Sequence, residues 1–235
     1  MMKSTILFIS CEHAVNTVPP AYLPLFKPYQ GLMETHRGKD FGALDIATHL
    51  CKTFHCEHAI ATVSRMVIDC NRSINHPHCF SEVTRDLPPL EKQKIIDTYY
   101  LPYRKKTETI IQNLIDQGHQ VLHVSSHSFT PVFEGITRNA GIGLLYDPKR
   151  HGEKEVAREW RGLLNQQTPT YRVRMNYPYI GTSDGFTTAL RKKHPEKDYL
   201  GIELEVNQTL VEDKASLNTL ISALSQSLKE LLQLL

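Results

Sequence analysis

Short runs of apolar residues alternate with longer stretches of helical periodicity along the chain. The short runs predict strands, and stretches in which apolar residues recur every three or four positions predict helices. The predicted strands are residues 6–10, 59–63, 66–68, 120–124, 142–146, 171–175 and 200–206. The predicted helices are residues 40–53, 91–117 with an interruption near Pro102, 153–164, 185–193 and 214–235. This order predicts an α/β fold, a single three-layer domain over residues 1–235 with a central mixed, mostly parallel sheet flanked by helices.

Composition narrows the class of protein. The 27 Lys and Arg residues nearly balance the 25 Asp and Glu residues, and neither sign is concentrated, so we expect neither nucleic acid nor an anionic membrane as a partner. The five cysteines are an odd number without a CxxC pair, which disfavours a disulfide framework. No apolar run approaches the length of a membrane span. Together these features predict a cytoplasmic protein.

Reactive polar residues lie just after, or at the end of, four of the predicted strands. They are Glu12 and His13, the segment 69–72, His127, and the segment 203–207. Ligands of α/β sheets sit beyond the carboxyl ends of the strands, so these residues are candidates for one site. Imidazole and carboxylate are zinc ligands, and a catalytic zinc keeps three protein ligands and one open position. Glu12, His13 and His127 would supply that set.

A second carboxylate outside the ligand set is needed to take the proton from the attacking water. Glu205 is the candidate, although Glu203 lies on the same face of its strand and periodicity alone does not separate the two. The sequence does not support a serine hydrolase or an NTPase, because the chain has neither a Gly-x-Ser-x-Gly elbow nor a Gly-x-x-x-x-Gly-Lys loop.

Six sequence strings, in order, carry a more specific signal. They are ILFISCEHAVNTVP, THRGKDFGALDIA, SRMVIDCNR, SSHSFTPVFEGITRNAGIGLLYD, NYPYIGTSDGFTTAL and GIELEVNQ. Through them the chain resembles the N-formylglutamate amidohydrolase family over about residues 5 to 210. That family resembles zinc carboxypeptidases and aspartoacylase-type deacylases. The resemblance implies a zinc carboxypeptidase-like fold, one bound zinc, and hydrolysis of an amide next to a carboxylate-bearing amino acid.

The resemblance also implies roles for the metal site. His127 in HSFTP corresponds to the second zinc histidine of the carboxypeptidase-like enzymes. Their other two ligands form a His-x-x-Glu motif, whereas here Glu12 and His13 are adjacent. His36 and Asp40 therefore compete with them, either as ligands or as partners that orient an imidazole. Similarity to the family's Ile-Glu-Val/Ile-Asn pattern favours Glu205 as the general base.

The substrate side follows from the same resemblance. Arg72 is expected to hold a substrate carboxylate through its planar guanidinium, with Asn71 donating beside it. Asp69 is expected to fix the arginine or a neighbouring loop. Arg138 is the leading second cation for a dicarboxylate, with Arg65 behind it. Tyr179 is expected to close over the substrate or donate to the oxyanion, or else to pack as an aromatic residue.

The function that follows is zinc-dependent hydrolysis of a small N-acyl amino acid. The family name implies N-formyl-L-glutamate as substrate, with formate and L-glutamate as products and Glu205 as base. Two alternatives stay open. One is deacylation of another N-acyl amino acid or a small peptide amide, since loops set acyl preference. The other is a metal-binding or substrate-binding protein without turnover on the same fold.

Overall fold

The structure is a computed structural model, and it describes residues 3–235. Six strands of these residues form one sheet in the order β2-β1-β3-β8-β6-β7. They are β1 (Thr5–Cys11), β2 (Glu57–Ile60), β3 (Gln120–Phe129), β6 (Ile142–Leu145), β7 (Val173–Met175) and β8 (Tyr199–Asn207). The first four strands in this order are parallel, whereas β6 is antiparallel to β8 and parallel to β7. The expected mixed, mostly parallel sheet is confirmed.

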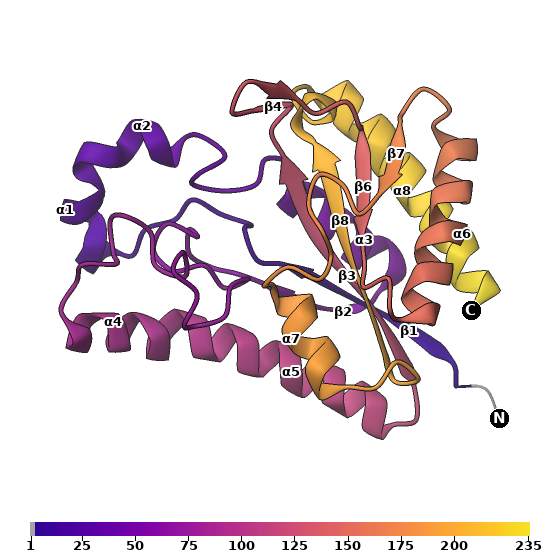
Figure 1. The fold of residues 1–235 in the computed structure, drawn as a ribbon, viewed down its shortest axis with the longest axis horizontal. Coiled ribbons are helices and arrows are strands. Elements are labelled where there is room, and N and C mark those ends of the chain that lie inside the picture. The colour runs from indigo at the N-terminus through magenta and orange to yellow at the C-terminus, as the bar shows by residue number, and fades with distance from the viewer. Residues whose placement is uncertain (1–2) are drawn as a thin grey trace.

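Helices cover both faces of the sheet (Figure 1). One face packs against α3 (Ala43–Phe54), α6 (His151–Gln167) and α8 (Lys214–Leu234). The other face packs against α5 (Leu101–Asp116) and α7 (Phe186–Lys193). The helix α4 (Pro89–Ile95) continues into α5 through a π-helical turn, Ile96–Tyr100, which ends two residues before Pro102. The α/β layer prediction is confirmed, and the single-domain boundary 1–235 stays a prediction.

The central strands present different chemistry to the two helical layers. In β3, Leu122 and Val124 belong to the apolar core under α3, α6 and α8. Successive side chains of a strand point to opposite faces. His123, Ser125 and His127 therefore face the α5 and α7 side, and all three are buried. This alternation places a polar stripe on one sheet face, running toward the carboxyl ends of the parallel strands.

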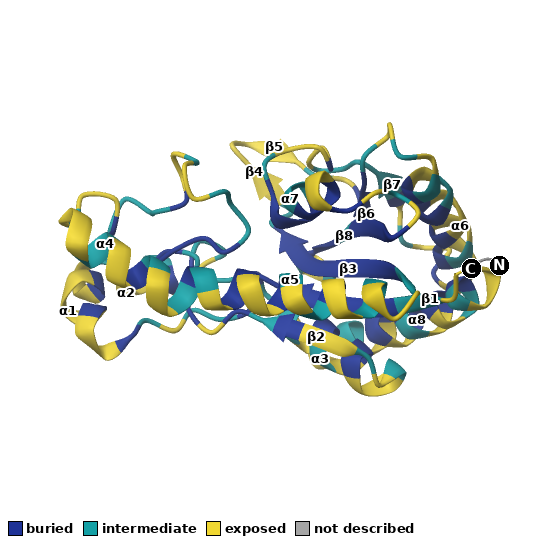
Figure 2. Cartoon of the chain, turned by 90° about the horizontal axis from the view of Figure 1, so that it is seen from below, coloured by how far each residue is buried: buried dark blue, intermediate teal, exposed yellow. Residues whose placement is uncertain are grey.

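A second body of structure extends beyond the carboxyl edge of the sheet (Figure 2). It contains α1 (Leu23–Phe26), α2 (Gln30–Met33), α4 and the irregular residues 61–88, and it has its own apolar core. The Pro-rich stretch around residues 19–28 thus contains short helices. A small hairpin, β4 (Val132–Phe133) and β5 (Ile136–Thr137), also lies outside the main sheet. These segments form the surroundings of the carboxyl edge.

Two strand predictions are corrected by the structure. Residues 66–68 form turns, with the amide of Val67 donating to the carbonyl of Ser64, and they pack in the core of the second body. An apolar run is therefore a sign of burial here without sheet pairing. The strand predicted for 120–124 continues to Phe129, so that His127 lies within β3. Within residues 3–235, no helix is long and apolar enough to cross a bilayer.

Candidate active site

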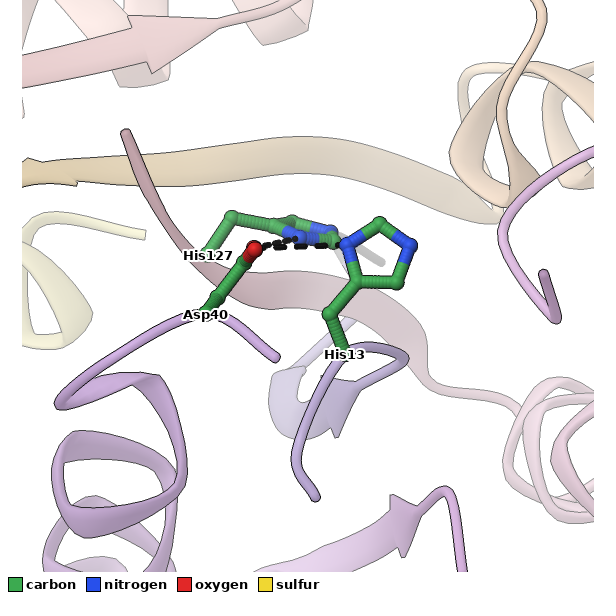
Figure 3. A group of neighbouring side chains, drawn as sticks. All are labelled: His13, Asp40 and His127. Atoms are coloured by element: carbon green, nitrogen blue, oxygen red, sulfur yellow. Dashed lines mark hydrogen bonds and ion pairs between the residues drawn. The ribbon is translucent and has the colours of Figure 1, made fainter. Parts of the chain in front are cut away.

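Three buried side chains meet at the carboxyl edge of the sheet. They are His13, in the turn after β1, Asp40, three residues before α3, and His127, in β3. Each offers one ligand atom, and these atoms all lie within 4.8 Å of one another (Figure 3). Two imidazoles and a carboxylate form a donor set of the kind that holds zinc. The arrangement is therefore able to hold a metal ion.

Backbone hydrogen bonds fix Asp40 against its neighbours. Its amide donates to the carbonyl of His13 at 2.9 Å, which ties the segment before α3 to the turn after β1. The amide of Ser128 donates to Asp40 Oδ2 at 3.3 Å and ties the same carboxylate to β3. Asp40 thus lies between two elements that are far apart in sequence. This explains how a residue 27 positions from His13 enters the same site.

Both imidazoles turn the same nitrogen toward Asp40 (Figure 3). Nδ1 of His13 lies 3.3 Å from Asp40 Oδ2, and Nδ1 of His127 lies 3.1 Å from the same oxygen. Each Nε2 faces a different carboxylate, Asp69 at 2.8 Å for His13 and Glu12 at 3.1 Å for His127. Histidine ligands commonly donate their second ring N–H to a carboxylate. The geometry therefore favours Nδ1 as the ligand atom of both residues.

Arg65 brings a positive charge to the edge of this group. Its Nη1 donates to Asp40 Oδ1 at 3.0 Å and lies 3.1 Å from His13 Nδ1. The same guanidinium donates to the backbone carbonyls of His36 and Arg37. His36 therefore contributes its backbone oxygen to the anchoring of Arg65, while Asp40 supplies the third side chain of the group.

The neighbouring charges shift the pKa values of all three residues. Burial alone would raise the pKa of Asp40, but Arg65 and the two histidines hold it well below its usual value. Burial alone would lower the pKa of His127, but Asp40 and Glu12 raise it well above its usual value. The pKa of His13 is also raised: burial opposes the shift, and the Asp69 charge outweighs it. In the absence of a metal, the negative charge of the carboxylates and the positive charge of the protonated imidazoles therefore balance each other.

Glu205 lies next to His127 on the neighbouring strand. The two residues are paired in the parallel register of β3 and β8, so their side chains share one sheet face. Glu205 is only 5% exposed, and within residues 3–235 its Oε2 has no hydrogen-bond partner. Burial, with the charges of Asp40 and Glu203, raises the pKa of Glu205 to about 8. A buried oxygen without a partner beside a possible metal position is available to bind water.

The surroundings of Glu203 and Glu205 distinguish the two residues, although strand periodicity does not. Glu203 accepts a short hydrogen bond from the Thr187 hydroxyl and so anchors the first turn of α7. Glu205 lies opposite Gly143 of β6, where a Cβ would approach the Tyr177 carbonyl to 1.8 Å. The glycine lets the segment around Tyr177 pass close to Glu205. The predicted role of Glu205 as the base remains a prediction, and the geometry favours it over Glu203.

Glu12 does not join the group of three. Its Oε1 accepts from Tyr103 at 2.7 Å, and its Oε2 accepts from Ser125 at 2.6 Å and lies near His127 Nε2. Asp40, which the sequence left open as an alternative to Glu12, is the third member of the group with His13 and His127. Sequence order alone does not distinguish two carboxylates that both lie near a histidine.

The predicted carboxylate clamp lies beside Asp69. The Arg72 guanidinium donates to the backbone carbonyl of Asp184, and its positive charge helps to lower the pKa of Asp69. Asn71 accepts at 2.7 Å from the amide of Phe186, the first residue of α7. Asn71 thus fixes α7 through its side-chain oxygen and keeps its NH₂ group for another partner. Asp69 accepts from the Asn71 amide within its own loop, in keeping with the second part of the expectation that it would fix the arginine or a neighbouring loop, and it also lies 2.8 Å from His13 Nε2.

Arg138 and Tyr179 lie against each other. The Arg138 guanidinium carbon is 4.6 Å from the ring centre of Phe133 and 5.0 Å from that of Tyr179. Burial of the hydroxyl raises the pKa of Tyr179, and the Glu205 charge adds to the shift. Tyr179 is nevertheless 44% exposed as a whole residue, so its ring borders solvent. In the described part of the chain, neither Arg138 nor Arg72 forms an ion pair with an acidic side chain.

Two residues that contact the site were not found from the sequence. Ser125 precedes His127 by two positions in β3, so strand alternation alone would have placed it on the same face. Tyr103 lies in α5, 91 residues from Glu12, and nothing local in the sequence connects the two. Such a contact arises only when α5 packs against the sheet.

Similarity to known proteins places the chain among the amidohydrolases. A family model for amidohydrolases matches residues 5–212, nearly the whole chain. The chain belongs to the family that this model describes, the N-formylglutamate amidohydrolases. The resemblance seen in the six sequence strings is confirmed.

Solved structures show the same fold. A gene product of Agrobacterium tumefaciens is 26% identical with a TM-score of 0.81, covering 98% of this chain and 91% of the other. The N-formylglutamate amidohydrolase of Ralstonia eutropha JMP134 is 19% identical with a TM-score of 0.69, covering 98% and 94%. A curated relative, the chloroplastic protein THYLAKOID FORMATION 1 of Arabidopsis thaliana, is 28% identical over 104 residues. That match covers 41% of this chain and 33% of the relative's length.

Proposed function

We propose that the protein hydrolyses the amide bond of N-formyl-L-glutamate, giving formate and L-glutamate, with one zinc ion held by His13, Asp40 and His127. The observation that carries the proposal is Glu205, a buried carboxylate whose Oε2 has no partner within residues 3–235 and whose strand neighbour is His127. A purely structural carboxylate in such a place would be expected to have a donor. The unpaired oxygen of Glu205 is accounted for if it binds the water that attacks the substrate.

The donor set fits zinc. Two imidazole nitrogens and one carboxylate oxygen would leave further coordination positions for water or substrate, as catalytic zinc sites require. Zinc bound there would polarise the acyl carbonyl and make water a stronger acid. The residues around it would hold the imidazoles in place through Asp69 and Glu12.

Glu205 would move the proton. A group whose pKa lies near neutral pH both accepts and releases a proton at little cost, which suits a general base that later acts as an acid. Burial raises the pKa of Glu205 to about 8 in the protein without metal. The carboxylate would take a proton from the attacking water and pass it to the nitrogen of the departing glutamate. The water oxygen would form the new bond to the formyl carbon as the C–N bond breaks.

Arg72 and Arg138 would bind the two carboxylates of the substrate. Both guanidinium groups are partly accessible and lack acidic side-chain partners within residues 3–235. Arg72 follows Asp69 in the same turn, and the Arg138 guanidinium lies over the ring of Tyr179. Holding both ends of the substrate would orient its amide for attack. The Asn71 NH₂ group would donate beside Arg72.

A related substrate is favoured by one further observation. Exposed apolar side chains of the β4–β5 hairpin, Val132, Phe133 and Ile136, lie beside Arg138 in sequence, and Phe133 contacts its guanidinium. Because Arg138 would hold the glutamate side chain, such a rim would suit an N-acyl amino acid with an apolar side chain in place of glutamate. The same chemistry would then act on another N-acyl amino acid.

The test is formate release from N-formyl-L-glutamate. Protein purified without chelator is compared with protein stripped of metal and with stripped protein reloaded with one equivalent of zinc. We expect release that is lost on stripping and restored by zinc. N-acetyl and N-succinyl analogues are assayed in parallel. Folded, zinc-loaded protein that hydrolyses none of these substrates would contradict the proposal.

A further inference from the structure

Glu12 is a fully buried carboxylate adjacent in sequence to His13, yet it faces the other histidine of the group. The residue is 1% exposed, and its Oε2 lies 3.1 Å from His127 Nε2. In residues 3–235, His127 is the only side chain that forms an ion pair with it. A buried carboxylate is costly unless it is paired and hydrogen-bonded. The structure therefore maintains this charge beside one specific imidazole nitrogen.

Two hydroxyl groups hold the Glu12 carboxylate in its position. Tyr103, from α5, donates to Oε1 at 2.7 Å, and Ser125, from β3, donates to Oε2 at 2.6 Å. Ser125 Oγ also lies 2.9 Å from His127 Nε2. With its proton directed at Glu12, Ser125 has lone pairs that face this nitrogen. Both neighbours of Nε2 are therefore acceptors, and they require it to carry a proton.

We propose that Glu12 is a positioning residue for the metal site, an inference that rests on the proposed function. It keeps the proton of His127 on Nε2 and so leaves the lone pair of Nδ1 directed at the space beside Asp40. In a neutral imidazole only one nitrogen carries hydrogen, so a donor bond at Nε2 makes Nδ1 the ligand atom. The Nδ1 atom lies 3.1 Å from Asp40 Oδ2, within the group of three ligand atoms.

The geometry assigns Glu12 this role in preference to that of a ligand. Both of its oxygens already accept hydroxyl protons, whereas Asp40 takes the third place in the group. A ligand role would require Glu12 to break its bonds with Tyr103 and Ser125 and to leave His127 Nε2 without its charged partner. Ser125 would then be the remaining partner of His127 Nε2.

The experiment measures zinc affinity and the state of His127 in the full chain. In Glu12→Gln, the size of the side chain is kept and its charge is removed. We expect zinc to bind about 10- to 100-fold more weakly, as for other partners of metal-bound histidines. Nitrogen NMR of zinc-loaded, histidine-labelled protein should show His127 bound through Nδ1 with a protected Nε2–H in the wild type. In the variant, that hydrogen should exchange faster with solvent.

Two further variants separate positioning from general stability. Tyr103→Phe removes one hydroxyl donor to Glu12 without touching the metal group, and it should weaken zinc binding severalfold. Glu153→Gln is the matched control, because Glu153 is an equally buried carboxylate that pairs with Arg191 away from the site. The control should lower thermal stability and leave zinc affinity unchanged. If Glu12→Gln does not fold, Tyr103→Phe carries the test.

The outcomes distinguish this inference from the proposed function. Zinc affinity within twofold of the wild type in Glu12→Gln or, failing that, in Tyr103→Phe, with an unchanged His127 spectrum, would overturn the role of Glu12 alone. A zinc-loaded wild type in which His127 binds through Nε2 would also overturn it. Wild-type protein that binds no zinc at all would overturn the proposed function and this inference together.

Discussion

The candidate site consists of two halves that differ in burial and in the secondary structure that supports them. The buried half is His13, Asp40, His127 and Glu205, all with less than a tenth of their surface exposed. The open half is Asn71, Arg72, Arg138 and Tyr179, which are half-buried or exposed and lie in irregular segments. In the buried half, His127 and Glu205 are neighbours on two central strands, which gives them a rigid support.

This difference has a physical reason. A metal and a proton-transfer group require positions fixed to within a fraction of an ångström, which strands and buried hydrogen bonds provide. Recognition of the rest of a substrate tolerates more variation and is commonly placed on loops. We therefore expect changes in the buried half to abolish turnover and changes in the open half to alter substrate preference.

The largest effect is expected from Glu205→Gln. Removal of a general base typically costs about 10²- to 10⁴-fold in rate. We expect a loss in kcat of that size, with zinc still bound at one equivalent, because Glu205 lies outside the ligand group. Steady-state kinetics and metal analysis on the same preparation check both parts. Turnover close to that of the wild type would remove Glu205 from the role of base.

Arg72 should give the next largest effect. Hydrogen bonds to charged groups are worth about 1.5–3 kcal/mol, so Arg72→Ala should lower kcat/KM by roughly 10- to 150-fold. Arg72→Lys should recover only part of the loss, since an ammonium group does not reproduce bidentate geometry. Kinetics with N-formyl-L-glutamate measures this, and zinc affinity serves as the control. Equal activity of the lysine variant and the wild type would argue against a bidentate clamp.

The pH dependence of stability should reveal the buried half in metal-free protein. The folded pKa of Glu205, about 8, lies above its unfolded value, so its contribution is present at low pH and is lost as pH rises toward 8. The raised pKa values of His13 and His127 act in the same direction above about pH 6.5. Between pH 6 and 8, Glu205 alone should remove roughly 2 kcal/mol from the free energy of unfolding.

Denaturant unfolding of metal-free protein at a series of pH values measures this effect. Below about pH 4 the stability should fall again, because the pKa values of Asp40 and Asp69 are lowered in the folded state. Glu205→Gln should flatten the alkaline side of the profile and leave the acid side unchanged. An alkaline side of the same slope in the variant would show that Glu205 does not titrate as described.

The smallest effect is expected from Arg138→Gln. The guanidinium is partly exposed and rests on Phe133 and Tyr179, so its contribution to binding should be about 1 kcal/mol, a loss of roughly fivefold in kcat/KM. The loss should apply to N-formyl-L-glutamate and not to N-formyl-L-glutamine, which lacks the side-chain carboxylate. A comparison of the two substrates checks this. Equal losses on both would place Arg138 outside side-chain recognition.

Sequence reasoning succeeded where local pattern determines the outcome. Strand and helix periodicity predicted the layers, and the polar residues at strand ends indicated the edge at which the site candidates gather. It was less successful where tertiary packing determines which residues enter the site or the core. The carboxylate that joins the two histidines is Asp40, which is brought into place by hydrogen bonds to His13 and Ser128 that form only in the folded chain. The apolar run at 66–68 is buried in a second core, which no periodicity reveals.

The most direct test of the account is the position of the metal. Crystals of the zinc-loaded protein, measured at the zinc absorption edge, would locate the ion without reference to activity. We predict one ion about 2.0–2.2 Å from Nδ1 of His13, Nδ1 of His127 and a carboxylate oxygen of Asp40. Glu205 should face the ion without binding it, and Glu12 should remain on His127 Nε2. An ion bound by Glu12, or one found away from the two histidines, would contradict the account.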